Sequence, residues 1–224
     1  MSMNAIPFAV DIEKVKAVFG CKDRALFEKI KTAAMYNHYA NQDYDFPGQQ
    51  YDYDFDEALE DIIFNFVKPE DRKIKSSFFG LIKSKPAAGL NENIAHVYGY
   101  VLLVICDYLG KHLLPSCDGF YYGRNFNEAC EIMKEKGLLI DLGDMFEPHQ
   151  VFDIPEIPDF PAINCYNRQD IQHINAVMDK IEIDENKANE DNEDFNEVQE
   201  MLKNIKQSFK TCEDENVEMI TFTH

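Results

Sequence analysis

Apolar and polar residues alternate at the two ends of this chain, and apolar residues recur at helical spacing over most of the length between them. Residues 5–11 form a short apolar run that predicts a β-strand, with Pro7 favouring an edge strand or the start of a strand. Residues 217–223 alternate in the manner of a second strand. We expect the first and last segments to pair in one small sheet, which favours a single domain.

The most apolar helix is predicted over residues 93–109. Large apolar side chains cover most of its circumference, and Gly110 follows as a helix terminator. A helix that is apolar nearly all round belongs in a core. We therefore predict a buried central helix, with these apolar positions: Val97, Tyr98, Val101, Leu102, Val104, Ile105, Tyr108 and Leu109.

Further amphipathic helices are predicted on both sides of the central one. They cover residues 12–19, 23–39, 55–66, 126–136, 168–181 and 194–212. Three pairs resemble capping boxes at helix starts: Asp54 with Glu57, Asn125 with Glu128, and Asn167 with Asp170. Residues 138–140 read as a short buried strand.

Four prolines exclude a helix between residues 146 and 166. This stretch is rich in Phe and Ile, so we expect it to pack as an extended segment in preference to serving as a linker. The predicted fold is α+β and mainly α, a single domain over residues 1–224 with acidic, insert-like segments at 41–57 and 182–194. The 194–212 helix faces the core in this reading, and self-association through it as a coiled coil stays open.

Charge excludes some partners. The 224 residues carry 41 Asp and Glu against 22 Lys and Arg, a formal net charge of -19. A chain with this net charge is not expected to bind nucleic-acid phosphate or an anionic membrane. The first residues have no basic, signal-like region, and the longest apolar stretch, residues 97–105, is far shorter than the roughly 20 residues that span a bilayer. We expect a cytoplasmic protein.

The six cysteines are widely spaced and form no C-x-x-C motif. Free thiols in a reducing compartment are the expected state. A zinc site would need ligands clustered at short spacing, so none is predicted.

The acidic segment, residues 41–57, is the best candidate for recognition. Residues 41–61 hold eight acids and no base, interleaved with aromatic side chains. Tyrosine offers rigid amphipathic contact area, and the acids speed encounter with a basic protein. The alternative is a solvated acidic loop whose aromatics partly fold inward. The predicted partner-binding residues are Asp43, Tyr44, Asp45, Tyr51, Asp52, Tyr53 and Asp54.

No catalytic motif of a known type is present, and we predict no catalytic residue and no cofactor. The rival hypothesis is a metal-assisted or hydrolytic enzyme. Its acid–base candidate is His96, near a helix N-terminus where a neutral imidazole is favoured. Its candidate metal ligands are Asp141, Asp144, Glu147 and His149, although their spacing matches no named site.

The chain resembles a bacterial family of uncharacterised proteins, a domain of unknown function, over roughly residues 5–181. The similarity lies in residues 8–20, 57–63 and 159–161, and most specifically in 96–110 (HVYGYVLLVICDYLG). The resemblance implies a compact, mainly helical cytosolic domain and no known activity. Acidic small proteins of this general kind are often immunity or antitoxin proteins, which is an analogy of type.

Overall fold

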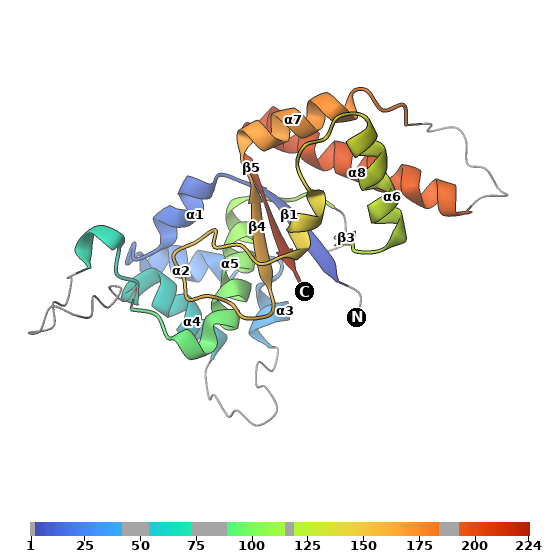
Figure 1. Cartoon of the computed structure of the whole chain (residues 1–224). Coiled ribbons are helices and arrows are strands. Elements are labelled where there is room, and N and C mark those ends of the chain that lie inside the picture. Colours follow the sequence, from blue (N-terminus) through green and yellow to red (C-terminus); the bar gives the residue numbers. More distant parts are fainter. Residues whose placement is uncertain (1–2, 42–53, 73–88, 115–118, 184–192) are drawn as a thin grey trace, which may run out of the picture. The chain divides into compact units, whose positions relative to one another are not determined.

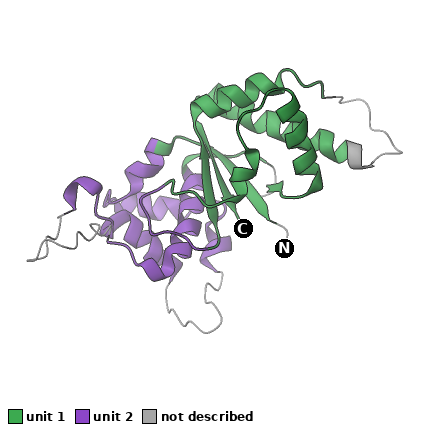
Figure 2. Cartoon of the chain, in the orientation of Figure 1, with its two compact units in different colours: residues 1–12, 109–151, 159–224 green, residues 13–108, 152–158 purple. Residues whose placement is uncertain are grey.

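The computed structural model describes residues 3–41, 54–72, 89–114, 119–183 and 193–224 (Figure 1). It is mainly helical with one small antiparallel sheet, so the predicted α+β class is confirmed. The chain forms two compact units (Figure 2). Unit 1 consists of Met1–Ile12, Leu109–Val151 and Asp159–His224, and unit 2 of Glu13–Tyr108 and Phe152–Pro158.

Unit 1 contains the sheet and three longer helices. Its elements are β1 (Asn4–Val10), β2 (Lys111–His112), β3 (Phe120–Tyr121), α6 (Arg124–Glu135), the 3₁₀ helix η5 (Leu142–Phe146), β4 (Ala162–Tyr166), α7 (Arg168–Met178), α8 (Glu193–Glu215) and β5 (Glu218–Thr223).

The first and last strands lie side by side in the sheet, as predicted. The strand order is β2-β1-β5-β4, and β3 also pairs with β1. The β1–β5 register runs from Ala5 opposite Thr223 to Val10 opposite Glu218. The two ends of the chain are therefore hydrogen-bonded to each other within the sheet of unit 1.

Pro7 lies in the middle of β1, between two neighbouring strands, so its predicted place at an edge or strand start is wrong. The Pro7 carbonyl accepts a hydrogen bond from Leu113 N at 3.0 Å, which places the Pro7 nitrogen on the β2 and β3 side. On that side β2 pairs only with Phe8 and Ala9, and β3 only with Asn4 and Ala5. The missing N–H thus lies opposite Leu113, one residue past the end of β2, where the ladder between β1 and β2 stops.

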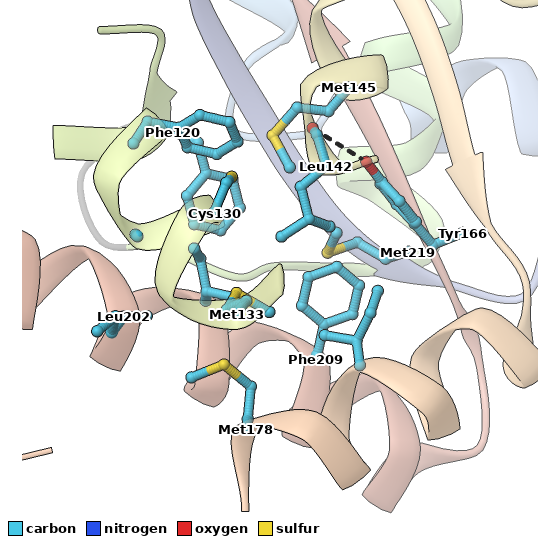
Figure 3. Close-up of a cluster of buried hydrophobic side chains, with 14 of the residues drawn as sticks. Phe120, Cys130, Met133, Leu142, Met145, Tyr166, Met178, Leu202, Phe209 and Met219 are labelled. Atoms are coloured by element: carbon cyan, nitrogen blue, oxygen red, sulfur yellow. Dashed lines mark hydrogen bonds between the residues drawn. The ribbon is translucent and has the colours of Figure 1, made fainter. Parts of the chain in front are cut away.

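The core of unit 1 lies on one face of the sheet, under α6, α7 and α8 (Figure 3). Ala9, Met219 and Tyr166 form one cross-strand row on this face. The small alanines of β1 leave room for the large side chains of the helices. The predicted core-facing side of α8 is confirmed, because Val198, Leu202, Ile205, Phe209 and Cys212 are all buried there.

Polar side chains of the sheet fasten η5 onto this core. Thr223 Oγ1 donates to Met145 O at 2.7 Å, and Asn164 Nδ2 donates to Asp144 O at 2.6 Å. Tyr166 Oη reaches Leu142 O at 3.4 Å (Figure 3). Because a buried polar group must be hydrogen-bonded, these contacts fix which residues of η5 face the sheet.

Unit 2 is built around the predicted central helix. Ten of the fifteen residues of α5 are buried, which confirms that prediction. The elements are α1 (Ile12–Val18), α2 (Arg24–Ile30), α3 (Tyr36–Ala40), α4 (Phe55–Glu60), the π-helix η1 (Asp61–Asn65), the 3₁₀ helices η2 (Pro69–Asp71) and η3 (Glu92–Ile94), and α5 (Ala95–Leu109).

A tight turn between α1 and α2 explains the π-helix that follows α4. Gly20 N and Lys22 N donate to the carbonyls of Ile62 and Ile63 at 2.8 and 2.9 Å. Those two carbonyls therefore have partners outside η1, and Phe66 N bonds Asp61 O across the wider π turn. Gly20 has φ +62°, and a Cβ there would lie 2.7 Å from Phe66 O, so the close approach requires glycine.

Three local predictions are wrong. The helix predicted over residues 23–39 is broken into α2 and α3, because Thr32 Oγ1 bonds Lys29 O and Met35 N bonds the carboxylate of Asp107. Asn125 caps no helix: α6 begins one residue earlier, at Arg124. Residues 138–140 form no strand, and the Leu139 side chain is 88% exposed. The Asn167–Asp170 capping box, in contrast, is confirmed.

We predict that Gly119 cannot be replaced without loss of stability. A Cβ at Gly119 would lie 2.0 Å from Asn4 Oδ1 and 2.5 Å from Ala5 O, so β1 would have to shift. We expect Gly119→Ser to lower the free energy of unfolding by about 1–3 kcal/mol, the usual cost of overpacking. The matched control is Gly123→Ser, because a Cβ there meets nothing within 4 Å and serine suits the N-cap of α6. Urea denaturation of both variants measures the difference, and equal stability would contradict this account of Gly119.

Candidate functional site

Most of the predicted partner-binding residues lie outside the described residues. These are Asp43, Tyr44, Asp45, Tyr51, Asp52 and Tyr53. Asp54 is described: it is the N-cap of α4, and its carboxylate accepts from Asp56 N at 3.0 Å. The described residues that flank the acidic segment are Asn41, directly after α3, and Asp54, directly before α4.

Lys31 and Tyr36 converge on the carboxylate of Asp56 at this place; we call these three side chains the Asp56 cluster. Tyr36 Oη donates to Asp56 Oδ1, and Lys31 Nζ pairs with Asp56 Oδ2. The rings of Tyr36 and Phe55 meet edge to face with centroids 5.9 Å apart. Tyr36 is only 8% exposed, so the cluster lies at the margin of the unit 2 core.

The electrostatics of the Asp56 cluster keep it in one protonation state. Burial, followed by the hydrogen bond to Asp56, raises the pKa of Tyr36 to about 12. The hydrogen bond to Asp56 raises the pKa of Lys31. At neutral pH Lys31 is therefore an ammonium and Tyr36 a neutral donor, the states in which both bind the Asp56 carboxylate.

A second set of charged side chains joins α2 to α4 beside this cluster. Arg24 pairs with Glu60 at 2.8 Å and with Glu28 at 3.2 Å. The Arg24 guanidinium also lies 4.5 Å from the centroid of the Phe27 ring, and Lys31 Nζ lies 5.3 Å from the same ring. Because Arg24 is well exposed, these pairs add little stability. They do show how this surface holds cations between carboxylates and aromatic rings.

The enzyme candidates come from both units. His96 belongs to α5 of unit 2, and Asp141, Asp144, Glu147 and His149 belong to unit 1. Asp141 caps η5 through Gly143 N at 2.9 Å, and His149 N donates to Ile163 O at 3.0 Å. Within the described part of the chain, no three His, Cys, Asp or Glu side chains lie close enough together to hold a metal ion.

The buried thiols are held in their unreactive form. Burial raises the pKa of Cys130 and of Cys212 to about 12. Since the thiolate is the nucleophile, these two cysteines act as apolar core residues at neutral pH. Burial likewise raises the pKa of Tyr166 well above its usual range.

The chain belongs to a family of proteins that share a domain of unknown function, DUF7691, whose model matches residues 1–224. Searches of curated proteins and of solved structures found no match. Among the residues that the structure describes, no helix combines the length and the apolar character needed to cross a membrane.

Sequence reasoning located the acidic segment but missed Lys31 and Tyr36. Their partner Asp56 is 25 and 20 residues away along the chain, and no helical or strand spacing links positions so far apart. The local signal in the sequence was that Asp54 and Asp56, within the acidic segment, open a helix.

The Asp56 cluster predicts a specific loss of stability at alkaline pH. The pKa of Tyr36 is raised from 10.0 to about 12 on folding, so its contribution is complete below pH 10 and is lost as pH rises to about 12. We expect Tyr36→Phe to lower the free energy of unfolding by about 1–2 kcal/mol at pH 7, since it removes a hydrogen bond to a charged, partly exposed group.

Urea denaturation over this pH range measures the effect. The difference between wild type and Tyr36→Phe should shrink above pH 10. The half-exposed Tyr121 provides the control Tyr121→Phe, which removes a tyrosine hydroxyl outside the Asp56 cluster. A Tyr36→Phe difference that is constant with pH would contradict the assignment.

Proposed function

We propose that this protein is a non-enzymatic protein-binding domain of the immunity or antitoxin type, which recognises a basic partner through its acidic segment. The observation that carries the proposal is a run of eight acids without a base, residues 41–61, within a chain of net charge -19. The contact residues proposed are Asp43, Tyr44, Asp45, Tyr51, Asp52, Tyr53 and Asp54.

The physical case rests on charge and on aromatic contact area. A concentrated negative surface raises the rate of encounter with a basic protein and disfavours acidic competitors. Tyrosine buries a large amphipathic surface at low conformational entropy cost, which is why it is frequent among the residues that dominate binding energy. In this proposal the acids of the segment raise the rate of encounter with the partner, and its tyrosines make the short-range contacts.

The chemistry of the described residues supports a binding role over an enzymatic one. Cys130, Cys212 and Tyr36 are shifted toward their protonated forms, away from nucleophilic or basic reactivity. We propose a cytoplasmic setting, which suits the free thiols of the described cysteines.

Self-association through α8 would need a surface other than its apolar side. The apolar positions of that helix that the structure describes are buried in unit 1, from Val198 to Cys212. A coiled coil uses those same positions for the second chain. We therefore propose a heterologous partner as the main interaction.

We predict that affinity depends on where the acids lie and not only on how many there are. One variant changes Asp43, Asp45, Asp52 and Asp54 to Asn, and its control changes Asp184, Glu185, Glu190 and Asp191 to the matching amides. Each loses four charges, so the net charge goes from -19 to -15 in both. We expect the first variant to lose about ten- to a hundredfold in affinity and the control to lose little.

The measurement starts with affinity capture from the native lysate at low and high salt, and mass spectrometry identifies the captured protein. The purified partner is then titrated with the three proteins. A basic partner that is lost at high salt and by the first variant alone supports the proposal. Equal loss in both variants would mean that only net charge matters, and no stoichiometric partner at low salt would argue against a binding domain.

A further inference from the structure

We infer that Phe19, Phe66 and Arg72 of unit 2 form a recognition site for an acidic, proline-containing segment of a partner protein; we call these three residues the Arg72 site. In the structure the chain's own residues 152–155 occupy this site. The Arg72 site lies outside residues 41–57, and its role is independent of the function proposed above.

The occupant meets the Arg72 site through one aromatic ring and one carboxylate. The rings of Phe152 and Phe19 are stacked, with centroids 5.9 Å apart and planes 15° apart. Arg72 Nη1 donates to Asp153 Oδ1 at 3.2 Å, and Arg72 Nη2 donates to the other oxygen of the same carboxylate. A guanidinium that binds both oxygens selects its ligand by geometry as well as by charge.

Unit 2 builds the site from its own residues. The rings of Phe19 and Phe66 meet edge to face with centroids 4.9 Å apart, and the turn at Gly20, which is bonded to η1, holds them together. Arg72 Nε donates to Val67 O at 2.9 Å, and the guanidinium lies 5.4 Å from the centroid of the Phe66 ring. Because none of these contacts involves residues 152–155, we expect the site to keep its shape without them.

The path of the chain marks the occupant as a separate piece of unit 2. The elements before and after it, η5 and β4, belong to unit 1, whereas Phe152–Pro158 belongs to unit 2 (Figure 2). Residues 152–158, all of which the structure describes, form no helix or strand. Such a stretch can leave its place at a lower cost than a helix or strand, because no helical or sheet hydrogen bonds within it have to break.

The sequence of the occupant has the pattern of a recognition motif. Residues 153–161 are three repeats of an acid, an apolar residue and a proline: DIP, EIP and DFP. Proline fixes its own φ and restricts the residue before it, so little conformational entropy is lost on binding. Proline-rich segments bind to grooves lined by aromatic side chains in several recognition domains. In the first repeat Asp153 is half exposed and Ile154 is buried.

Charge complementarity selects an acidic segment. The Arg72 side chain is only 12% exposed, and a cation buried to this degree is costly without a counter-charge. A partner must therefore supply a carboxylate in place of Asp153, and it competes with a segment whose effective concentration is high because it belongs to the same chain. Two copies of a chain of net charge -19 repel each other, so the partner is a different protein.

The experiment uses a synthetic peptide of residues 150–158 (QVFDIPEIP) with blocked ends and a fluorescent label. The opened variant carries Phe152→Ala and Asp153→Ala, and Asp153→Ala alone serves if the double variant does not fold by circular dichroism. Fluorescence anisotropy should give a dissociation constant of about 10–100 µM for the opened variant. Wild type should bind at least about tenfold more weakly, because its own segment competes.

Two changes test whether Arg72 holds the peptide. A peptide with Asp153→Asn should bind the opened variant about tenfold more weakly, because the charge-assisted pair is lost. Arg72→Lys in the opened variant should weaken binding similarly, since an ammonium lacks the planar fork. The matched control is Arg168→Lys, which alters an arginine paired with Glu218 at 3.1 Å in unit 1 and should leave binding unchanged.

Three results would overturn the inference. One is a folded opened variant that does not bind the peptide, and another is equal binding to wild type and the opened variant, since the peptide would then bind elsewhere. The third is a wild-type dimer in sedimentation that Asp153→Ala abolishes, because the occupant in trans would then be a second copy. None of these measurements involves residues 41–57, so this proposal and the binding function fail separately.

Discussion

The pairing of the first strand with the last is the constraint on which the rest of unit 1 depends. β1 and β5 are hydrogen-bonded neighbours although some two hundred residues separate them along the chain. Bringing such distant segments together costs loop-closure entropy, which grows only slowly with length. The burial of Ile6, Phe8, Ile220 and Phe222 in the paired strands offsets this cost through the hydrophobic effect.

The same pairing explains why unit 2 is inserted and not appended. Residues 13–108 leave the sheet directly after β1 and return at β2, which pairs with Phe8 and Ala9 of that strand. An insertion whose two ends lie close together disturbs its host little, because the host keeps its own strand ladder. Pro7 and Gly119 fit this arrangement. Pro7 lies opposite Leu113, where the ladder to β2 stops, and Gly119 allows the chain before β3 to approach β1 closely.

The parts of the fold that the sequence predicted are those with a strong local pattern. The apolar α5, the amphipathic α8, the Asn167–Asp170 cap and the alternating β5 all carry their signal within a few turns or residues. The errors come from distant contacts. Asp107 captures Met35 N and helps to break one helix, and a turn at Gly20 and Lys22 converts the end of another into a π-helix. A single sequence holds no local trace of either contact.

The candidate site also has one feature that the sequence predicts and one that it does not. Composition alone indicates the acidic segment, because eight acids without a base stand out in any window. The sequence does not predict the contacts of Lys31 and Tyr36 with Asp56, because 25 and 20 residues separate these partners along the chain. The proposal of a binding role thus rests on the sequence pattern, and the contacts of Asp56 are known only from the fold.

The most direct test of the account is to map which carboxylates touch the basic partner in the intact complex. A carbodiimide joins a carboxylate to a lysine ammonium only when the two are in contact, and mass spectrometry then identifies the joined residues. The account predicts cross-links at Asp43, Asp45, Asp52 and Asp54. Cross-links confined to residues 182–194 or to the exposed acids of α8 would contradict it, because the partner would then bind elsewhere on the acidic surface.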